Sequence, residues 1–242
     1  MTSYRQTLYE NYFSHQAGRY LSNAEQQLQN DTALLRQEIL PLIPPNTDAH
    51  MLDVGCGYGS LVQVLVQQGY HNVLGIDLSE EQVEKAYSLG IKNVYQTDVF
   101  AFFEDNNTFY DCIVALDLIE HFSKTELLEL LRQIRQKLSP QGYAIFRTPN
   151  TDGLFGSVYA YGDYTHETLL NCNSAIQLMR SAGFGEVNVM PSKIIVRGFL
   201  KKILQRVSYA LMTTVARSVL FATGRSTRNV IFTPNMLIKV SK

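Results

Sequence analysis

From Ala49 onward, short apolar runs alternate with amphipathic stretches. Apolar runs of strand length are typical of buried β-strands, and apolar residues three or four positions apart are typical of helices that cover a sheet. This βαβα alternation predicts an α/β fold with a parallel sheet and helices on both faces. The expected strands are 50–54, 72–77, 93–96, 110–116, 142–148, 184–190 and 230–240.

Helices are expected over 59–68, 80–88, 124–138 and 172–182. Ser123 stands before the third of these with Glu126 three positions later, which is the spacing of a capping box. Gly183 follows the fourth, in the position that favours a left-handed C-cap. The run Ser139-Pro140-Gln141-Gly142 predicts a turn before the next strand.

A proline cluster, Pro41-Leu42-Ile43-Pro44-Pro45, separates a helical N-terminal stretch from this alternating region. We therefore expect an N-terminal arm over 1–45 and a main domain over 46–242. Within the main domain, 191–229 stands apart as an insertion before the last strand.

The composition is that of a packed globular protein. The chain has 242 residues, of which 45% are hydrophobic and 18% charged, values that exclude a collagen-like fibre, a coiled-coil rod and a disordered tail. Cys56, Cys112 and Cys172 are too scattered for a disulfide framework or a zinc site, so we expect a reducing compartment and no metal. The first residues lack the apolar core of a signal peptide, which favours the cytoplasm.

Charge is divided along the chain. Residues 1–186 hold all 22 Asp and Glu with 11 Lys and Arg, whereas 187–242 hold 10 Lys and Arg and no acid. This asymmetry predicts either an anionic partner for the C-terminal part or docking of that part on the acidic body of the same chain.

The segment Met51 to Ser60 is a strand that runs into a glycine-rich turn and then a helix. Gly55, Gly57 and Gly59 allow positive φ angles and close approach of a ligand to the backbone, and the helix start offers free N–H groups. A tight structural turn is the alternative interpretation. The pattern predicts a nucleotide-like cofactor.

Acidic residues follow the successive strands. Asp53, Asp77, Asp98 and Asp117 stand at or near strand ends, so with the glycine turn they are expected to meet in one crevice at the carboxyl edge of the sheet. A dinucleotide-binding turn would need glycine or alanine where Ser60 stands, and this disfavours a nicotinamide cofactor.

These segments resemble the motifs of class I S-adenosylmethionine-dependent methyltransferases. The likeness extends over about 49–190 and rests on LDVGCGYG, GIDLS, TDVF, YDCIVALDLIEHF and LSPQGYAIFRTPN, in the family's order. It implies a Rossmann-like, doubly wound sheet of seven strands with an antiparallel last strand. It also implies S-adenosylmethionine as cofactor and S-adenosylhomocysteine as product.

The resemblance implies a role for each residue around the cofactor. Asp53 and Gly55 would hold the methionine amino end, Asp77 the ribose hydroxyls and Asp98 the adenine amine. Leu78 and Val99 would cover the two faces of the adenine ring. Carboxylates accept hydrogen bonds from such donors and apolar side chains cover flat rings. Alternatively, Asp53 caps the following helix, and Leu78 and Val99 belong to the core.

Methyl transfer to a hydroxyl is helped by a base that takes its proton. We expect His166, in the loop after the fifth strand, to be this base, with Asp163 or Glu167 orienting it. His121, directly after the fourth strand, is the second candidate, and it could instead orient its loop through a hydrogen bond.

The acceptor side is predicted to be polar and aromatic. Residues 148–153 with Tyr159, Tyr161 and Tyr164 would suit a sugar, since aromatic faces stack on pyranose rings. These segments resemble methyltransferases of bacterial surface-polysaccharide synthesis, which implies O-methylation of a saccharide or its lipid-linked precursor. A soluble small molecule or quinone precursor, with the insertion as a lid, is the alternative; a non-catalytic cofactor-binding scaffold is the third.

Residues 193–222 combine apolar residues at helical spacing with Lys193, Arg197, Lys201, Lys202 and Arg206. A basic amphipathic helix of this kind predicts peripheral binding to an anionic membrane, binding to a partner, or packing on its own domain. Its uncharged run is far shorter than the ~20 residues of a spanning helix. Nucleic acid is not expected, since no recognised module is present.

The N-terminal arm is rich in aromatic residues: Tyr4, Tyr9, Tyr12, Phe13 and Tyr20. Arms of similar methyltransferases fold over the cofactor, so the resemblance implies a lid here. A homodimer contact is the alternative.

Overall fold

The computed structural model describes residues 24–242. The aromatic residues of the predicted lid or dimer contact, from Tyr4 to Tyr20, lie outside the described residues.

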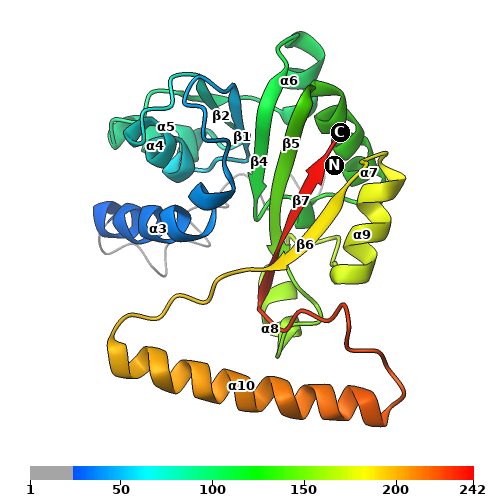
Figure 1. The fold of residues 1–242 in the computed structure, drawn as a ribbon. Helices are drawn as coiled ribbons and strands as arrows, with labels where there is room; N and C mark the ends of the chain where they lie inside the picture. Colours follow the sequence, from blue (N-terminus) through cyan, green and yellow to red (C-terminus); the bar gives the residue numbers. More distant parts are fainter. Residues whose placement is uncertain (1–23) are drawn as a thin grey trace.

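The core of the molecule is a seven-stranded sheet (Figure 1). Its strands follow the order β3-β2-β1-β4-β5-β7-β6, and β7 is antiparallel to both of its neighbours while the other pairs are parallel. The predicted fold class is therefore confirmed, including the reversed last strand. The strands are β1 Met51–Val54, β2 Val73–Asp77, β3 Val94–Gln96, β4 Tyr110–Leu116, β5 Leu138–Pro149, β6 Val187–Pro191 and β7 Asn235–Ser241.

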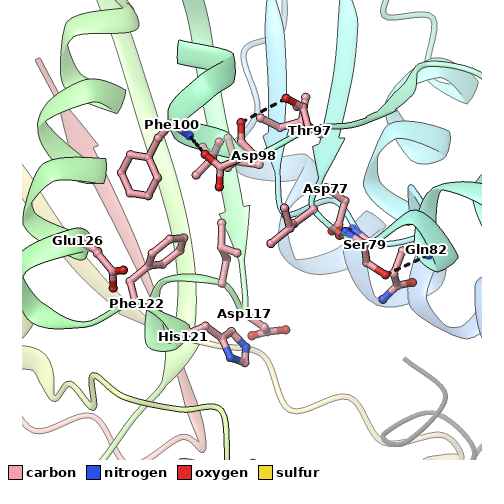
Figure 2. Close-up of a pocket in the computed structure, with 17 residues that line it drawn as sticks. Asp77, Ser79, Gln82, Thr97, Asp98, Phe100, Asp117, His121, Phe122 and Glu126 are labelled. Carbon is pink, nitrogen blue, oxygen red and sulfur yellow. Dashed lines mark hydrogen bonds between the residues drawn. The ribbon is translucent and has the colours of Figure 1, made fainter. Parts of the chain in front are cut away.

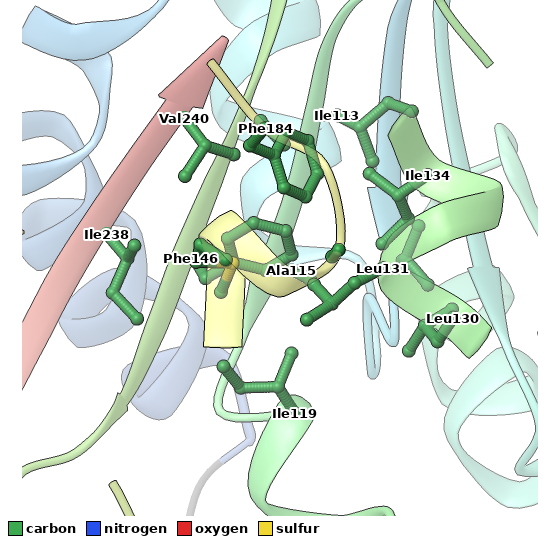
Figure 3. Packing of buried hydrophobic residues seen from close by; sticks show 14 of the residues in the cluster. Ile113, Ala115, Ile119, Leu130, Leu131, Ile134, Phe146, Phe184, Ile238 and Val240 are labelled. Atoms are coloured by element: carbon green, nitrogen blue, oxygen red, sulfur yellow. The ribbon is translucent and has the colours of Figure 1, made fainter. Parts of the chain in front are cut away.

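Helices cover both faces of this sheet. On one face, α3 (Ala24–Glu38), α4 (Ser60–Gln67) and α5 (Glu80–Ser88) contribute to one apolar cluster with the 3-10 turn η1 (Leu40–Leu42) beside it. On the other face, α6 (Val99–Asp105), α7 (Lys124–Lys137) and α9 (Cys172–Ser181) contribute to a second cluster. Figure 3 shows its centre, where Leu131 and Ile134 of α7 face Phe146 of β5. Each fully buried aliphatic side chain there contributes about 1.5–3 kcal/mol.

Two predicted helix signals have the expected geometry. Ser123 Oγ accepts a hydrogen bond from the Glu126 N–H, and the Glu126 carboxylate accepts one from the Ser123 N–H at 3.0 Å, which completes the capping box of α7. Gly183 follows α9 with φ +96°, a conformation that side chains other than glycine rarely adopt. Local sequence therefore fixes the start of α7 and the end of α9.

Several element bounds differ from the prediction. The predicted turn 139–142 lies inside β5, where the pairing with β4 shifts register between Tyr110 and Cys112. Four short elements were not predicted: η1, α6, α8 (Gly156–Ala160) and the turn η2 (Ile119–His121). Such short elements lack the length over which an apolar period can be recognised.

The predicted insertion contains one long helix, α10 (Phe199–Ala222). Residues 193–198 are not part of it, so the prediction that Lys193 and Arg197 lie on the helix was wrong. Gly198 precedes the helix with φ +93°, and Lys193 is held by contacts to α3. None of the α10 residues is buried. Figure 1 shows the helix beyond the sheet, at the end where β6 finishes.

No helix among residues 24–242 is both long and apolar enough to cross a bilayer.

Candidate active site

The glycine turn joins β1 to α4, and its three glycines have different reasons to be glycine. Gly55 has φ +67°, which strains any other residue, and a Cβ there would lie 2.7 Å from a Leu118 methyl carbon, so Leu118 would have to move. Gly57 lies against the cavity, and a Cβ there would meet only the Gln82 side chain at ordinary contact distance. Gly59 packs against Ile91 and does not line the cavity. At this position the glycine serves the tight turn and not the ligand, which is the alternative interpretation given above.

A cavity of about 650 Å³ opens at the carboxyl ends of the strands beside this turn. This volume suits a drug-sized ligand. Figure 2 shows the residues around it: Asp77 and Gln82 lie on one side, Phe122 on the other, and His121 lies next to Asp117. The structure thus brings most of the predicted site residues to one cavity, namely Gly55, Gly57, Asp77, Leu78, Asp98, Val99, Asp117 and His121.

Asp77 is held in place by the backbone. Its Oδ2 accepts a hydrogen bond from the Gly57 N–H at 2.7 Å, and its Oδ1 accepts one from the Ser79 N–H at 2.8 Å. Burial raises the pKa of this carboxyl, while these N–H groups act against the rise. The carboxylate therefore has a fixed orientation at the cavity wall. Its neighbour Leu78 is 57% exposed, which is more than a core residue would be.

Asp98 has a structural role as well as a place in the cavity wall. Its Oδ1 accepts hydrogen bonds from the Phe100 N–H at 2.9 Å and the Ala101 N–H at 3.2 Å, so Asp98 is the N-cap of α6. The second carboxylate oxygen, Oδ2, can still accept from a ligand. Val99 lines the cavity and also packs against the core.

A second, smaller cavity of about 290 Å³ adjoins the first through Gly55, Gly57 and Asp117. Asp53 lines this smaller cavity and not the larger one. Its side chain is buried, and burial together with the charge of Asp77 raises its pKa to about 8. A cationic group bound here would favour the ionised carboxylate.

Arg147 lies between the smaller cavity and α3. Its guanidinium forms ion pairs with Asp117 and, at 2.9 Å, with the buried Glu38 carboxylate of α3. These two carboxylates raise the pKa of the guanidinium against the opposing effect of burial. Asp117 has a φ of +51°, unusual for a residue with a side chain, and its pairing with Arg147 stabilises it there.

His121 lines the larger cavity and contacts a polar chain. Its Nδ1 lies 2.9 Å from Thr165 Oγ1, and the Thr165 hydroxyl donates to Asp163 Oδ1 at 2.7 Å. The prediction paired Asp163 with His166. In the structure Asp163 accepts a hydrogen bond from Thr165, and Thr165 contacts His121. Burial and the neighbouring His166 lower the pKa of His121, so its imidazole is neutral at neutral pH.

His166 stacks edge-on against His121, with ring centroids 4.8 Å apart. Its Nδ1 lies 2.8 Å from the Ala160 carbonyl oxygen, so a backbone group orients this ring. Glu120 lies next to the pair and is 1% exposed. Burial, and then the charge of Asp117, raise the pKa of the Glu120 carboxyl.

Sequence reasoning missed several residues that line the two cavities, among them Gln82 and Arg147. Gln82 lines the larger cavity, and its Oε1 is buried and accepts no hydrogen bond from the described protein groups. Such an atom calls for a ligand donor. Arg147 is the single charge in an apolar strand, and a charge in a buried strand needs a partner. That signal could have identified it, but the sequence does not show which acid pairs with it.

The fold and the cavity define a class of protein. A seven-stranded sheet with a reversed last strand, a glycine turn and an acid after β2 is the architecture of the Rossmann-like S-adenosylmethionine-dependent methyltransferases. The buried acceptor of Gln82 and the buried Asp53 carboxyl beside the turn fit a cofactor with hydrogen-bond donors and a cationic amine.

The comparisons with known proteins agree with this class. A family model described as "Methyltransferase domain" matches residues 24–189, and the chain belongs to this family. The chain is 34% identical over 116 residues to the ubiquinone biosynthesis O-methyltransferase of Rickettsia prowazekii, covering 46% of this chain and 45% of that protein. The protein of the same name in Aliivibrio fischeri is 30% identical over 105 residues, or 41% of this chain and 44% of that protein. The matches thus span less than half of these relatives' length.

Solved structures share the fold. A S-adenosylmethionine-dependent methyltransferase from Archaeoglobus fulgidus has a TM-score of 0.66 at 19% identity, covering 89% of this chain and 94% of that chain. A magnesium protoporphyrin IX methyltransferase from Synechocystis with bound cofactor has a TM-score of 0.52 at 15% identity, covering 89% and 80%. The chain therefore contains a methyltransferase domain, and the cofactor of this family is S-adenosylmethionine.

Proposed function

We propose that this enzyme O-methylates a ring hydroxyl of a quinone precursor at a membrane surface. The observation that carries the proposal is the pair of imidazoles, His121 and His166, next to the cofactor cavity. Such a pair can take a proton from a hydroxyl acceptor. The names of the curated relatives support the quinone precursor over the saccharide that the sequence favoured.

The cofactor roles expected from the resemblance fit the cavity walls. Asp77 would accept hydrogen bonds from the ribose hydroxyls, and Leu78 and Val99 would cover the adenine ring. Asp98 would use Oδ2 for the adenine amine, since Oδ1 already caps α6. Asp53 would face the cationic amine from the smaller cavity.

When bound, S-adenosylmethionine supplies an electrophilic methyl group on a positively charged sulfur. The protein's own contribution is to hold the acceptor in line and to receive its proton. We assign the proton to His166, whose ring is oriented by the Ala160 carbonyl, and the alignment of the acceptor to His121 with its Thr165–Asp163 chain.

The α10 helix supports a membrane location for the acceptor. Leu200, Leu204, Val207, Leu211 and Val215 recur at helical spacing and are each more than half exposed. The helix carries basic residues and no acid. It follows β6, which runs in the same direction as β5. The helix therefore lies beyond the carboxyl ends of these strands, the end of the sheet at which the cavity opens. Each basic residue near an anionic leaflet contributes about 1 kcal/mol to binding.

The acceptor is tested with methyl-labelled cofactor and two acceptor pools, a quinone-precursor fraction and a saccharide or glycolipid fraction. Label in the quinone precursor supports the proposal, and label confined to the saccharide overturns it. The His166→Asn variant is expected to lose turnover while retaining cofactor affinity. His71→Ala, an exposed histidine away from the cavity, is the control.

Membrane binding is tested by co-sedimentation with anionic vesicles. Changing Lys201, Lys202 and Arg206 to Gln is expected to abolish sedimentation. The matched control changes Lys92, Lys124 and Arg132 to Gln. These exposed residues lie outside α10, and their replacement removes the same number of positive charges. Equal binding by the two variants would contradict the assignment to α10.

A saccharide acceptor remains the second candidate because of one surface feature. Tyr159, Tyr161 and Tyr164 are 48%, 76% and 88% exposed, more than the wall of a packed core requires. Exposed aromatic faces stack on sugar rings. The same two-pool assay separates this acceptor from the quinone precursor.

A further inference from the structure

The smaller cavity beside the glycine turn is rich in acidic groups. Among the described residues that line it, the charged ones are Asp31 of α3, Asp53 of β1, Asp117 after β4 and Arg147 of β5. Three carboxyl groups thus accompany one guanidinium. A cavity with this balance of charge favours a cationic ligand over an anionic one.

The guanidinium of Arg147 is already neutralised by acids of the protein. Its Nε donates to the two carboxylate oxygens of Asp117 at 3.0 and 3.2 Å, and its Nη2 donates to the same carboxylate. Its Nη1 donates to the buried Glu38 carboxylate at 2.9 Å. A ligand carboxylate here would bring a third negative charge to a cation that two carboxylates already neutralise.

Most backbone donors of the glycine turn are also engaged. The N–H groups that donate to acceptors of the protein are those of Gly55, Cys56, Gly57 and Gly59. Their acceptors are the Ile76 carbonyl oxygen, the Asp77 carboxylate and the Cys56 carbonyl oxygen. The start of α4 offers a ligand carboxylate only the partial charges of a helix end. The turn therefore provides little that would offset the acids of the cavity.

The Asp53 carboxyl has no hydrogen-bond partner among the residues that the structure describes. Asp53 is 4% exposed, and its surroundings act on it through burial and through the charges of Asp77 and Arg147. A buried polar group without a partner calls for a ligand. An ammonium group supplies both the hydrogen-bond donors and the charge that a buried carboxylate needs.

Asp31 reaches the same cavity from a different part of the chain. Its Oδ2 accepts a hydrogen bond from the Tyr58 hydroxyl, so a residue of the glycine turn fixes its orientation. Its other carboxylate oxygen can accept from a ligand. The cavity is thus bounded by a carboxyl group from each of two separate elements, α3 and β1.

We infer that the smaller cavity selects its ligand by a primary ammonium group, held by Asp53 and Asp31, and does not require a carboxylate beside that group. The inference rests on the proposed placement of the cofactor's amino end in this cavity and extends it to specificity. Decarboxylated S-adenosylmethionine keeps the ammonium group and lacks the carboxylate. The enzyme is therefore expected to bind it at least as well as S-adenosylmethionine.

The test uses three ligands that share a neutral sulfur and the adenosine group. They are S-adenosylhomocysteine, its decarboxylated amine, and methylthioadenosine, which lacks both the ammonium and the carboxylate. Calorimetric titration of the full chain is expected to give the amine an affinity within about 3-fold of S-adenosylhomocysteine or higher, and methylthioadenosine one about 10- to 100-fold lower. An amine that binds more than about 10-fold more weakly than S-adenosylhomocysteine overturns the inference.

Two variants assign the ammonium group to its carboxylates. Asp53→Asn and Asp31→Asn are each expected to weaken both amine-bearing ligands about 10-fold or more and to leave methylthioadenosine unchanged. Asp105→Asn, at an exposed position, is the matched control. Circular dichroism confirms that each variant is folded, and either variant suffices if the other is not. Equal weakening of all three ligands would contradict the assignment.

Proton release is a readout that the shape of the cavity alone would not change. Burial, and then the charge of Asp77, raise the pKa of Asp53 to about 8 against the effect of Arg147, so the empty cavity holds a proton at neutral pH. The thiols of Cys56 and Cys112 stay protonated, because burial raises their pKa values. Binding of the ammonium group is expected to release about one proton.

Calorimetry in buffers of different ionisation enthalpy counts these protons. Asp53→Asn is expected to remove most of the release, and the Asp105→Asn control to retain it. Binding of S-adenosylhomocysteine to the wild type without proton release would overturn the assignment of the ammonium group to Asp53.

The ligand tests are independent of the acceptor. The expected order of the three ligands, without methyl transfer to the quinone precursor, would leave this inference standing and overturn the proposed function. Methyl transfer to the quinone precursor by an enzyme that binds the decarboxylated amine poorly would do the reverse.

Discussion

Asp53 lies in β1, Asp77 ends β2 and Asp98 follows β3, and their surroundings differ although each belongs to the expected cofactor site. Asp77 is anchored by two backbone N–H groups at the cavity wall. Asp98 caps α6, and Asp53 is buried in the wall of the smaller cavity. The sequence predicted which acids come together at this edge of the sheet. Only the structure shows that Asp77 is held by backbone N–H groups, that Asp98 caps a helix and that Asp53 is buried.

Asp77→Asn is expected to weaken cofactor binding about 10- to 100-fold. The amide retains the shape but loses charge-assisted hydrogen bonds of about 1.5–3 kcal/mol. Isothermal titration of the variant with S-adenosylmethionine measures the effect. Asp105→Asn, at an exposed position, serves as the control. Equal affinities for the wild type and Asp77→Asn would remove Asp77 from the binding site.

The buried Asp53 makes stability depend on pH. Its pKa is 3.8 in the unfolded chain and about 8 in the fold, so the folded protein holds the proton more tightly. The free energy of unfolding therefore declines as the pH rises from about 4 to about 8. Asp53→Asn lacks this dependence. Urea unfolding of the cofactor-free proteins at several pH values is expected to show the steeper decline in the wild type, and parallel profiles would contradict it.

At the scale of elements, α3 links three parts of the molecule. Its Glu38 carboxylate accepts hydrogen bonds from Arg147 of β5 and from the Lys193 N–H, in the segment that leads from β6 to α10. Asp31 of the same helix lines the smaller cavity. The sequence predicted α3 as part of an arm separate from the main domain. In the structure its residues Leu28 and Leu35 belong to an apolar cluster of the sheet, which places α3 against the domain.

Glu38→Ala is expected to lower the free energy of unfolding by about 3–5 kcal/mol, because it leaves a mostly buried Arg147 with one partner fewer. Denaturant unfolding measures this change. The comparison variant is Glu129→Ala, whose partner Arg132 is half exposed. That surface pair contributes less than about 1 kcal/mol. Similar losses in both variants would mean that the buried pair contributes no more than an exposed one.

At the scale of the whole molecule, the domain and α10 differ in how they are stabilised. The domain has apolar clusters on both faces of its sheet, whereas none of the α10 residues is buried. An exposed apolar helix of this size is typical of a surface that contacts another component. The sequence predicted a basic amphipathic segment here and left membrane, partner and own-domain packing open. The exposure of α10 argues against packing on its own domain.

Replacing Phe199–Ala222 by a short glycine-serine linker is expected to leave the midpoint of thermal unfolding unchanged and to abolish vesicle binding. The reason is that the helix buries no side chain in the domain. Leu131→Ala, in the fully buried part of α7, is the comparison and is expected to cost about 2–5 kcal/mol. A large drop in the midpoint on removing α10 would show that the helix stabilises the fold.

The sequence by itself determined the alternation of strands and helices, the capped helices and the glycine turn, because these follow from apolar period, capping residues and glycine positions that act over a few residues. The seven-stranded sheet with its reversed last strand was implied by the family resemblance of the motifs. The tertiary structure decided the partners of the buried charges, since Arg147 finds Asp117 and Glu38 only when β5, β4 and α3 come together. It likewise decided the meeting of Glu120, His121 and His166. Contacts between segments far apart in the chain have no local signal, because they arise from packing of the finished elements.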